Sequence, residues 1–292
     1  MELRLLKKIK DISELVAFEH TIFSAPFMLI ALFCASMQKN HSLWFGFSLL
    51  FLCALALIFA RNFAMGFNRY LDRDIDAKNQ RTQNRPSVDG RISAKAILVF
   101  IFANAVCFVL VSYFINSLAF WLSLPFLMIL GFYSYMKRFS YLAHLVLGVS
   151  LGLAPIAGCI AVLGDVPLWC FFLSAGVLFW VAGFDLLYSL QDIEFDKNEG
   201  LHSIPSVFGV EKTLWISRAF HLLTLVFWGV FLHSFGCGIF GFVGLGICSL
   251  ILFYEQYLVS RDFAHIPKAF FVSNGYLGFV FLVMMILDLS ME

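Results

Sequence analysis

The sequence predicts an all-α integral membrane protein with a cytoplasmic N-terminus, and three observations support this fold class. Hydrophobic residues make up 61% of the 292 residues, and the mean hydropathy is +0.87. Charged residues make up 13%, whereas soluble domains have about 25%. Nine apolar segments can be marked, each close to the roughly 20 residues that a helix needs to cross a bilayer.

The chain begins with a basic segment, residues 1–14, whose hydrophobic side chains recur at helical spacing. This pattern is typical of a short amphipathic helix on the membrane surface. The apolar segments follow and predict spans near residues 15–37, 43–66, 94–115, 118–136, 141–163, 168–190, 213–234, 237–258 and 268–288. Two polar loops interrupt this series, at 67–93 and 191–212, and we expect residues 1–292 to form a single domain.

Lysine and arginine lie almost entirely on one side of the predicted bundle. Successive loops must lie on opposite sides of the membrane. This places Lys39 on one side and, on the other, the N-terminus and the loops that contain Arg69 to Arg91, Lys137, Arg138, Lys197, Lys212 and Arg261. Because basic loops stay in the cytoplasm, both polar loops are predicted to face the cytoplasm and the C-terminus the outside. No cleavable signal peptide is evident, so we expect a multi-pass protein of a bacterial inner membrane. The second and sixth spans share one orientation, which suggests two parallel four-helix halves and a ninth helix.

The second span ends in an acidic motif, with Asn68, Asp72 and Asp76 at four-residue intervals. On a helix these three side chains share one face. Oxygen ligands without His or Cys suit a hard cation, and Mg²⁺ prefers one or two carboxylates with waters and substrate phosphates. Basic residues follow directly, at Lys78, Arg81 and Arg85. Carboxylates beside cations are the groups that a diphosphate–Mg²⁺ complex needs.

A second acidic motif follows the sixth span, with Asp185, Asp192 and Asp196 again on one helical face. The segments DRDIDAKN at 72–79 and DIEFDKNE at 192–199 resemble each other. Because the pattern recurs at equivalent points of a multispanning chain, the two motifs are predicted to form one site.

These motifs resemble the two signatures of the UbiA superfamily of membrane prenyltransferases. The first is NxxxDxxxD at 68–76, followed by KNQRT and by RP at 85–86, and the second is DxxxxxxDxxxD at 185–196, followed by the SxPSVFG run at 203–209. YSYMKR at 133–138 resembles a further family segment. The resemblance covers nearly the whole chain. It implies nine transmembrane helices in a ring around a central cavity, and Mg²⁺-dependent transfer of a polyprenyl chain from its diphosphate to an aromatic acceptor, typically 4-hydroxybenzoate in quinone biosynthesis.

Three departures from the family pattern concern the acceptor. Asn68 is followed by Arg69, where many members have Asp, and no Lys precedes Ser203. The first span contains FEHTIFSAPF at 18–27 in place of an Asp-Lys-Pro type of opening. These features resemble a branch linked to menaquinone made by the futalosine route, so a naphthoate acceptor is the alternative to 4-hydroxybenzoate. A haem or chlorophyll-type ring is a further acceptor that the sequence leaves open.

The resemblance, together with the chemistry of each side chain, assigns roles around the diphosphate. Two Mg²⁺ ions would be held by Asn68, Asp72, Asp76, Asp192 and Asp196 and would act as Lewis acid and template. The candidates for contact with phosphate oxygens are Arg81, Lys137, Arg138 and Lys197. Aromatic faces suit the allylic carbocation, and Tyr133 and Tyr188 lie near the motif ends of their spans.

The acceptor is expected to bind deeper in the bilayer. Asp185 precedes Asp192 by two helical turns, and an ionisable residue there indicates function. We expect Asp185 to orient or deprotonate the acceptor and Arg61 to bind an acceptor carboxylate, with Glu19 and His20 as further lining. The alternative for Arg61 and Asp185 is a purely structural buried ion pair.

A transporter for a divalent cation or an organic anion is the competing class, because membrane carboxylates and parallel halves also suit transport. Transport sites lie near the midplane, whereas most carboxylates here are predicted at the cytoplasmic ends, interleaved with bases. No nucleic-acid module is present. The other histidines make no metal-ligand spacing and are interpreted as interfacial or packing residues: His41, His144, His221, His233 and His265.

Overall fold

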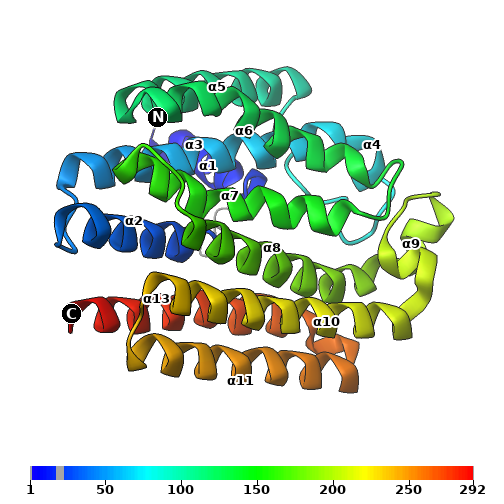
Figure 1. Cartoon of the computed structure of the whole chain (residues 1–292). Helices are drawn as coiled ribbons and strands as arrows, with labels where there is room; N and C mark the ends of the chain where they lie inside the picture. Colours follow the sequence, from blue (N-terminus) through cyan, green and yellow to red (C-terminus); the bar gives the residue numbers. More distant parts are fainter. Residues whose placement is uncertain (1, 18–22, 292) are drawn as a thin grey trace.

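The structure is a computed structural model of the chain and describes residues 2–17 and 23–291. All regular secondary structure in these ranges is helical (Figure 1). The long helices are α2 (Ala25–Asn40), α3 (Phe47–Leu71), α5 (Ala94–Ile115), α6 (Ser117–Met136), α7 (Ala143–Leu163), α8 (Leu168–Ser189), α10 (Ile204–Phe235), α11 (Ile239–Arg261) and α13 (Asn274–Ser290). The shorter ones are α1 (Glu2–Leu15), α4 (Arg73–Asp76), η2 (Leu190–Asp192), α9 (Ile193–Asn198), η3 (Phe263–His265), α12 (Ile266–Lys268) and η4 (Ala269–Ser273).

The predicted fold class, an all-helical membrane protein, is confirmed. Eight helices in the described ranges are long and apolar enough to cross a membrane. Helix α2, in place of the first predicted span at 15–37, has 16 residues and begins at Ala25, because Pro26 fits only the first turn of a helix. Leu15 belongs to the preceding helix α1, where it is buried with 1% of its surface exposed. The count of nine membrane spans therefore stays a prediction.

Helix α8 lies at the centre of the helix packing. It packs between α7 and α10, while α11 joins α10 to α13 and α13 contacts α2. Helices α3, α5 and α6 form a second group, which α6 joins to α7. Helix α2 packs mainly on α7 and α13, so the contacts divide the chain differently from two consecutive four-helix halves. The reason is local, because a Cβ at Gly158 of α7 would lie 2.8 Å from the Met28 carbonyl oxygen of α2.

Large aromatic side chains fill the core around α8. Trp180 and Trp228 are fully buried, and the Phe27 ring lies 5.1 Å from each of them, measured between ring centroids. Gly176 makes room for this contact, since a Cβ there would lie 2.1 Å from Trp228. This packing fixes the helix that carries the second acidic motif.

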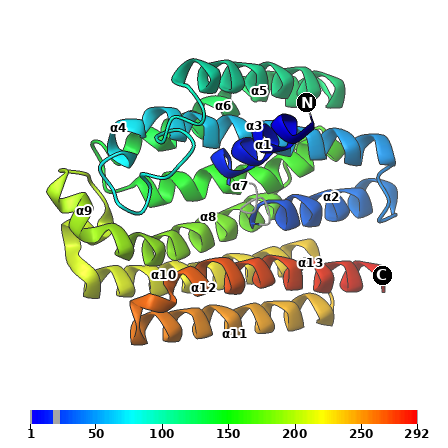
Figure 2. The same cartoon turned by 180° about the vertical axis from the view of Figure 1, so that it is seen from behind.

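Both acidic motifs lie where a long helix breaks. Helix α3 ends at Asp72, with φ −88° and ψ 10°, and α4 then begins. Helix α8 passes through η2 into α9 at Asp192, with the similar angles φ −106° and ψ 8°. Helices α4 and α9 lie at the same end of the bundle, and the C-terminus lies at the opposite end (Figure 1). Seen from behind, α1 lies against α3 (Figure 2).

Candidate active site

One cavity connects the two acidic motifs at this end of the bundle. Its lining contains eleven of the residues to which the sequence analysis assigned a role in the site, namely Arg61, Asn68, Asp72, Asp76, Arg81, Tyr133, Lys137, Asp185, Tyr188, Asp192 and Asp196. The two motifs are more than 100 residues apart in the sequence, so the prediction of a shared site agrees with this geometry.

In the first motif, Asn68 and Asp72 form one unit and Asp76 another. Asn68 Nδ2 donates to Asp72 Oδ2 at 2.8 Å across one helical turn. Burial raises the pKa of Asp72 to about 6, although the positive charge of Lys137 acts in the opposite direction. The carboxylate of Asp76 accepts two hydrogen bonds from Arg85, whose Nη1 lies 2.7 Å from each carboxylate oxygen.

In the second motif, Asp192 is the most heavily bonded carboxylate. Arg81 holds it with two hydrogen bonds, Nε to Oδ1 at 3.1 Å and Nη2 to Oδ2 at 2.5 Å. Asn79 Nδ2 donates to the same Oδ1 at 3.1 Å. Asp196, one turn further on, accepts from the hydroxyl of Ser203 at 2.8 Å.

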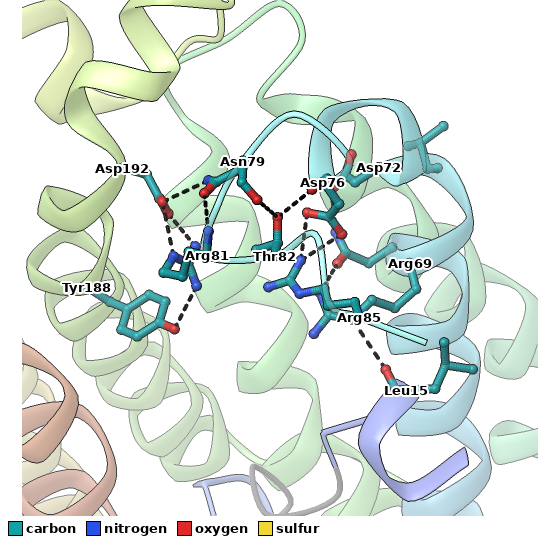
Figure 3. A network of polar contacts seen from close by, with 12 residues as sticks. Leu15, Arg69, Asp72, Asp76, Asn79, Arg81, Thr82, Arg85, Tyr188 and Asp192 are labelled. Carbon is teal, nitrogen blue, oxygen red and sulfur yellow. Dashed lines mark hydrogen bonds and ion pairs between the residues drawn. The ribbon is translucent and has the colours of Figure 1, made fainter. Parts of the chain in front are cut away.

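The loop between α4 and α5 therefore ties the two motifs together (Figure 3). Arg85 bonds to the first motif and Arg81 to the second, and Arg81 Nη1 also donates to the Tyr188 hydroxyl at 3.1 Å. Thr82, between them, donates to the carbonyl oxygen of Asp76 at 2.9 Å and shapes the turn. Two guanidinium groups from the first polar loop, those of Arg81 and Arg85, thus line the cavity.

Lys137 is the cation at the centre of this arrangement. Burial alone would lower the pKa of its ammonium group, but the surrounding carboxylates of Asp196, Asp185, Asp192 and Asp72 raise it above the usual value. Its side chain makes no ion pair shorter than 4.0 Å with a described residue. A positive group with negative charge around it and no direct partner is suited to bind an anion that enters with its own cations.

Arg138 and Lys197 do not line the cavity. Arg138 faces outward, where its Nη2 donates to Asp74 Oδ1 at 3.0 Å and to the Leu71 carbonyl oxygen at 2.7 Å. The same nitrogen lies 3.6 Å from Asp72 Oδ1, so Arg138 touches the site through Asp72. Lys197 is exposed on α9. Their predicted contact with phosphate oxygens stays a prediction.

The deeper end of the cavity is lined by Arg61 and Asp185. Arg61 Nη2 donates to the Ala17 carbonyl oxygen at 3.0 Å, and its Nε has no hydrogen-bond partner among the described residues. Asp185 Oδ2 lies 2.7 Å from Nδ1 of His144 on α7. The structure therefore gives each a different partner within the described ranges and no direct Arg61–Asp185 pair. Glu19 and His20 lie outside the described residues.

An apolar cavity continues from this deeper end between α2, α3, α5, α6 and α7. It shares Arg61, Met65, Tyr133, Leu147 and Leu151 with the polar cavity. Its remaining lining is almost entirely hydrophobic and includes Cys53, Leu57, Phe108, Phe126 and Ala154. Together the two cavities form one charged part and one apolar part.

Aromatic rings surround the junction on the α8 side. Tyr188 lies 4.4 Å from Phe270, and Phe184 and Phe23 lie 5.2 and 5.3 Å from the same ring, all between centroids. All four rings line the polar cavity. Aromatic faces stabilise a nearby cation without accepting a conventional hydrogen bond.

The donor set fits a hard divalent cation that is shared with a phosphate ligand. Among residues 2–17 and 23–291, no three His, Cys, Asp or Glu side chains converge to hold an ion by themselves. Asp72 and Asp196 both line the cavity, and each accepts a hydrogen bond from a neutral side chain, Asn68 or Ser203. Mg²⁺ normally takes only one or two carboxylates and completes its shell with waters and phosphates.

The sequence analysis missed several residues of this site. Asn79 and Thr82 lie in the KNQRT segment, but no role was assigned to them, and Phe23, Phe184 and Phe270 look like ordinary core residues in an aromatic-rich chain. His144 was interpreted as a packing residue, whereas the structure pairs it with Asp185. The contacts of Asn79 with Asp192 and of His144 with Asp185 span 113 and 41 residues, so no local pattern reveals them.

Comparison with known proteins agrees with this geometry. The model of the UbiA prenyltransferase family matches residues 24–283. A 4-hydroxybenzoate octaprenyltransferase from Aromatoleum aromaticum is 31% identical over 246 residues, which cover 82% of this chain and 81% of the relative. The apo structure of a UbiA homologue from Aeropyrum pernix K1 superposes with a TM-score of 0.78 at 29% identity, covering 94% of this chain and 98% of that one. A UbiA homologue from Archaeoglobus fulgidus, bound to GPP and Mg²⁺, has the same fold, with a TM-score of 0.71, 19% identity and coverage of 96% and 99%.

Proposed function

Because the chain belongs to the UbiA prenyltransferase family, we propose that it transfers a polyprenyl group from polyprenyl diphosphate to 4-hydroxybenzoate, in a Mg²⁺-dependent reaction of quinone biosynthesis. One observation carries the proposal. A single cavity joins both acidic motifs and their arginines to a deeper end with Arg61 and Asp185 and to an apolar extension. These three parts correspond to a diphosphate, an aromatic acid and an isoprenoid chain.

The diphosphate would bind between the motifs. Lys137 and Arg81 offer positive charge to phosphate oxygens, and Arg is suited to hold two oxygens together. The residues that would hold Mg²⁺ are Asn68, Asp72, Asp76, Asp192 and Asp196. When bound, Mg²⁺ supplies Lewis-acid stabilisation of the leaving diphosphate. The relative from Archaeoglobus fulgidus, which binds GPP with Mg²⁺, supports this use of the fold.

The acceptor would lie between the aromatic rings and the deep polar pair. The guanidinium of Arg61 would bind its carboxylate, because this buried cation has no carboxylate partner among the described residues. Asp185 would face the hydroxyl end. Tyr188 and Phe270 would flank the allylic cation as it forms. The relatives named 4-hydroxybenzoate octaprenyltransferase favour this acceptor.

The same geometry also accepts a naphthoate precursor of menaquinone, which is the alternative acceptor. It is favoured by Arg69 after Asn68 and by the absence of a Lys before Ser203. A transporter is disfavoured by family membership and by the position of the carboxylates at one end of the bundle, paired with arginines.

The site would face the cytoplasm of a bacterial inner membrane. The proposal is supported by the concentration of Lys and Arg at the end of the bundle that holds α4 and α9. Accessibility labelling of single cysteines placed at Lys78 and at Asp165 in intact cells and in inverted vesicles tests this orientation.

The function is tested by a prenyl-transfer assay on purified membranes with labelled long-chain polyprenyl diphosphate. The assay offers 4-hydroxybenzoate beside the naphthoate, with Mg²⁺ or with EDTA. Mg²⁺-dependent label on 4-hydroxybenzoate is the expected result. Label on the naphthoate alone would keep the reaction and change the acceptor, and label on neither in active membranes would contradict the proposal.

A further inference from the structure

The contact between His144 and Asp185 carries a further inference, which rests on the proposed prenyl transfer. His144 is fully buried on α7, and its Nδ1 lies 2.7 Å from Asp185 Oδ2. Asp185 lines the cavity with 20% of its side chain exposed. An ionised carboxylate only accepts hydrogen bonds, so Nδ1 must carry the proton and donate it.

Asp185 differs from Asp76 and Asp192 in the kind of donor that holds it. Asp76 and Asp192 are bound by the guanidinium groups of Arg85 and Arg81. A guanidinium stabilises the carboxylate charge and makes the group a weaker proton acceptor. The His144 ring contacts one oxygen of Asp185, Oδ2, and Asp185 makes no ion pair with an arginine among the described residues. Of these three carboxylates, Asp185 is therefore the one best suited to take a proton.

The backbone forces this pair together. A Cβ at Gly148 of α7 would lie 2.3 Å from the carbonyl oxygen of Leu178, so α7 and α8 approach more closely here than a larger residue permits. His144 lies one turn before Gly148, and Asp185 lies two turns after Leu178 on the antiparallel helix. The close helix contact thus sets the position of both side chains.

We propose that His144 is a positioning residue that holds Asp185 as the base of the transfer step. In this step the allylic C–O bond breaks and the diphosphate leaves with the electron pair. A C–C bond forms between the allylic carbon and the ring carbon of the acceptor. The ring C–H bond then breaks, its electrons restore the aromatic ring, and its proton passes to the free oxygen of Asp185. The Nδ1–H of His144 stays bonded to Oδ2 throughout, which keeps that free oxygen directed at the acceptor.

Nε2 of His144 agrees with this assignment. It is buried and has no hydrogen-bond partner among the described residues. A proton on Nε2 would therefore be a buried donor without an acceptor among the described residues, which is costly. The surroundings favour the neutral ring with its proton on Nδ1, which is the form that Asp185 needs.

The test compares two variants of similar shape, His144→Asn and His144→Leu, in the full-length protein. Asn places an amide donor near the position of Nδ1, and Leu has none. The assay measures transfer to the acceptor that the wild type prenylates, both unlabelled and deuterated at the reacting ring carbon. We expect His144→Leu to lower kcat about 10–100-fold with little change in KM for prenyl diphosphate, and to raise the deuterium isotope effect on kcat, because proton loss becomes slow. His144→Asn should recover much of the rate.

His221→Leu is the matched control. His221 is also buried and contacts α8 at Gly183, two residues from Asp185. A Cβ at Gly183 would lie 2.5 Å from Nε2 of His221. It does not bond to Asp185, so its loss should loosen the packing of α8 without an isotope effect. Equal loss in the Asn and Leu variants of His144, an unchanged isotope effect, or an isotope effect in His221→Leu would each overturn the role of His144. A wild type without prenyl transfer would overturn the proposed function itself.

Discussion

The two acidic motifs have nearly the same backbone but different surroundings. In both, a long helix breaks at an aspartate, Asp72 or Asp192, and a second aspartate follows one turn later. The first motif leads into a long loop that reaches across the cavity, whereas the second leads into a short turn closed by the Ser203 capping box. Each motif therefore supplies its own carboxylates, whereas the two arginines that bind them, Arg81 and Arg85, both come from the loop after the first motif.

The deeper ends of the two motif helices also differ. Helix α3 carries a cation there, Arg61, and α8 carries an anion, Asp185. An acceptor with a carboxylate at one end and a hydroxyl at the other is complementary to this pair. We propose that this asymmetry orients the acceptor, whereas the symmetric part of the site would hold the diphosphate.

The largest expected effect comes from removing one carboxylate of either motif. Asp72→Asn and Asp192→Asn should each lower turnover about 100-fold or more while membrane insertion stays intact, because in the proposed site both motifs would act on one diphosphate. Transfer assays on membranes with matched protein levels measure this. Near-normal turnover in both variants would show that the repeated carboxylates have no role in metal or diphosphate binding.

The next effect concerns the loop between α4 and α5, which contacts both motifs. Arg81→Lys keeps a positive charge but loses the bidentate contact with Asp192, and we expect transfer to fall about 10-fold or more. The control is Lys78→Ala, since Lys78 also links this loop to the second half, through Glu199 at an exposed position. Exposed ion pairs contribute little, so the control should keep its activity. Equal losses in the two variants would mean that any link between loop and second motif suffices.

A smaller effect is expected from Arg138→Ala. Arg138 lies 3.6 Å from Asp72 and outside the cavity, so its loss should weaken prenyl diphosphate binding several-fold through the position of Asp72. Titration with prenyl diphosphate measures the change. A shift in acceptor affinity alone would assign Arg138 to the other substrate.

The smallest effect concerns helix α1, which contacts α3 and is bonded through Arg91 to the loop that follows the first motif. Arg91 donates to Glu14, Asp11 and Asp89, and its guanidinium lowers the pKa of Glu14 below the usual 4.5. The stabilisation is complete above pH 4.5 and is lost as the pH falls through the lowered value. Glu14→Gln should therefore increase proteolysis of the N-terminal segment at pH 7 to the level that the wild type reaches in acid. Proteolysis that is the same in both proteins at pH 7 would remove α1 from this account.

Local patterns predicted the helices and the carboxylates. Asp72 and Asp76, like Asp192 and Asp196, stand at a four-residue spacing beside apolar runs, and such signals depend only on neighbouring residues. The partners of these carboxylates were harder to predict. The contact of Arg81 with Asp192 spans 111 residues, and a basic loop residue has several possible partners until the helices are packed.

The start of α2 and the role of His144 show a second reason for error. Apolar residues 15–17 look like the start of a span. In the structure Leu15 is the last residue of α1, and residues 16 and 17 form the turn after it, because an apolar run does not show where one helix ends and the next begins. His144 lies in an apolar helix with no charged neighbour in sequence. Only the close approach at Gly148 brings it to Asp185, and glycine spacing alone did not indicate which helix would be approached.

The central claim, that both motifs bind one Mg²⁺–diphosphate group, is tested most directly by equilibrium binding of a non-reactive prenyl diphosphate analogue with and without Mg²⁺. The proteins are the wild type, Asp72→Asn and Asp192→Asn. The account predicts that Mg²⁺ tightens binding to the wild type and that each single variant loses this gain. Binding by either variant that Mg²⁺ still tightens as in the wild type would contradict a shared site.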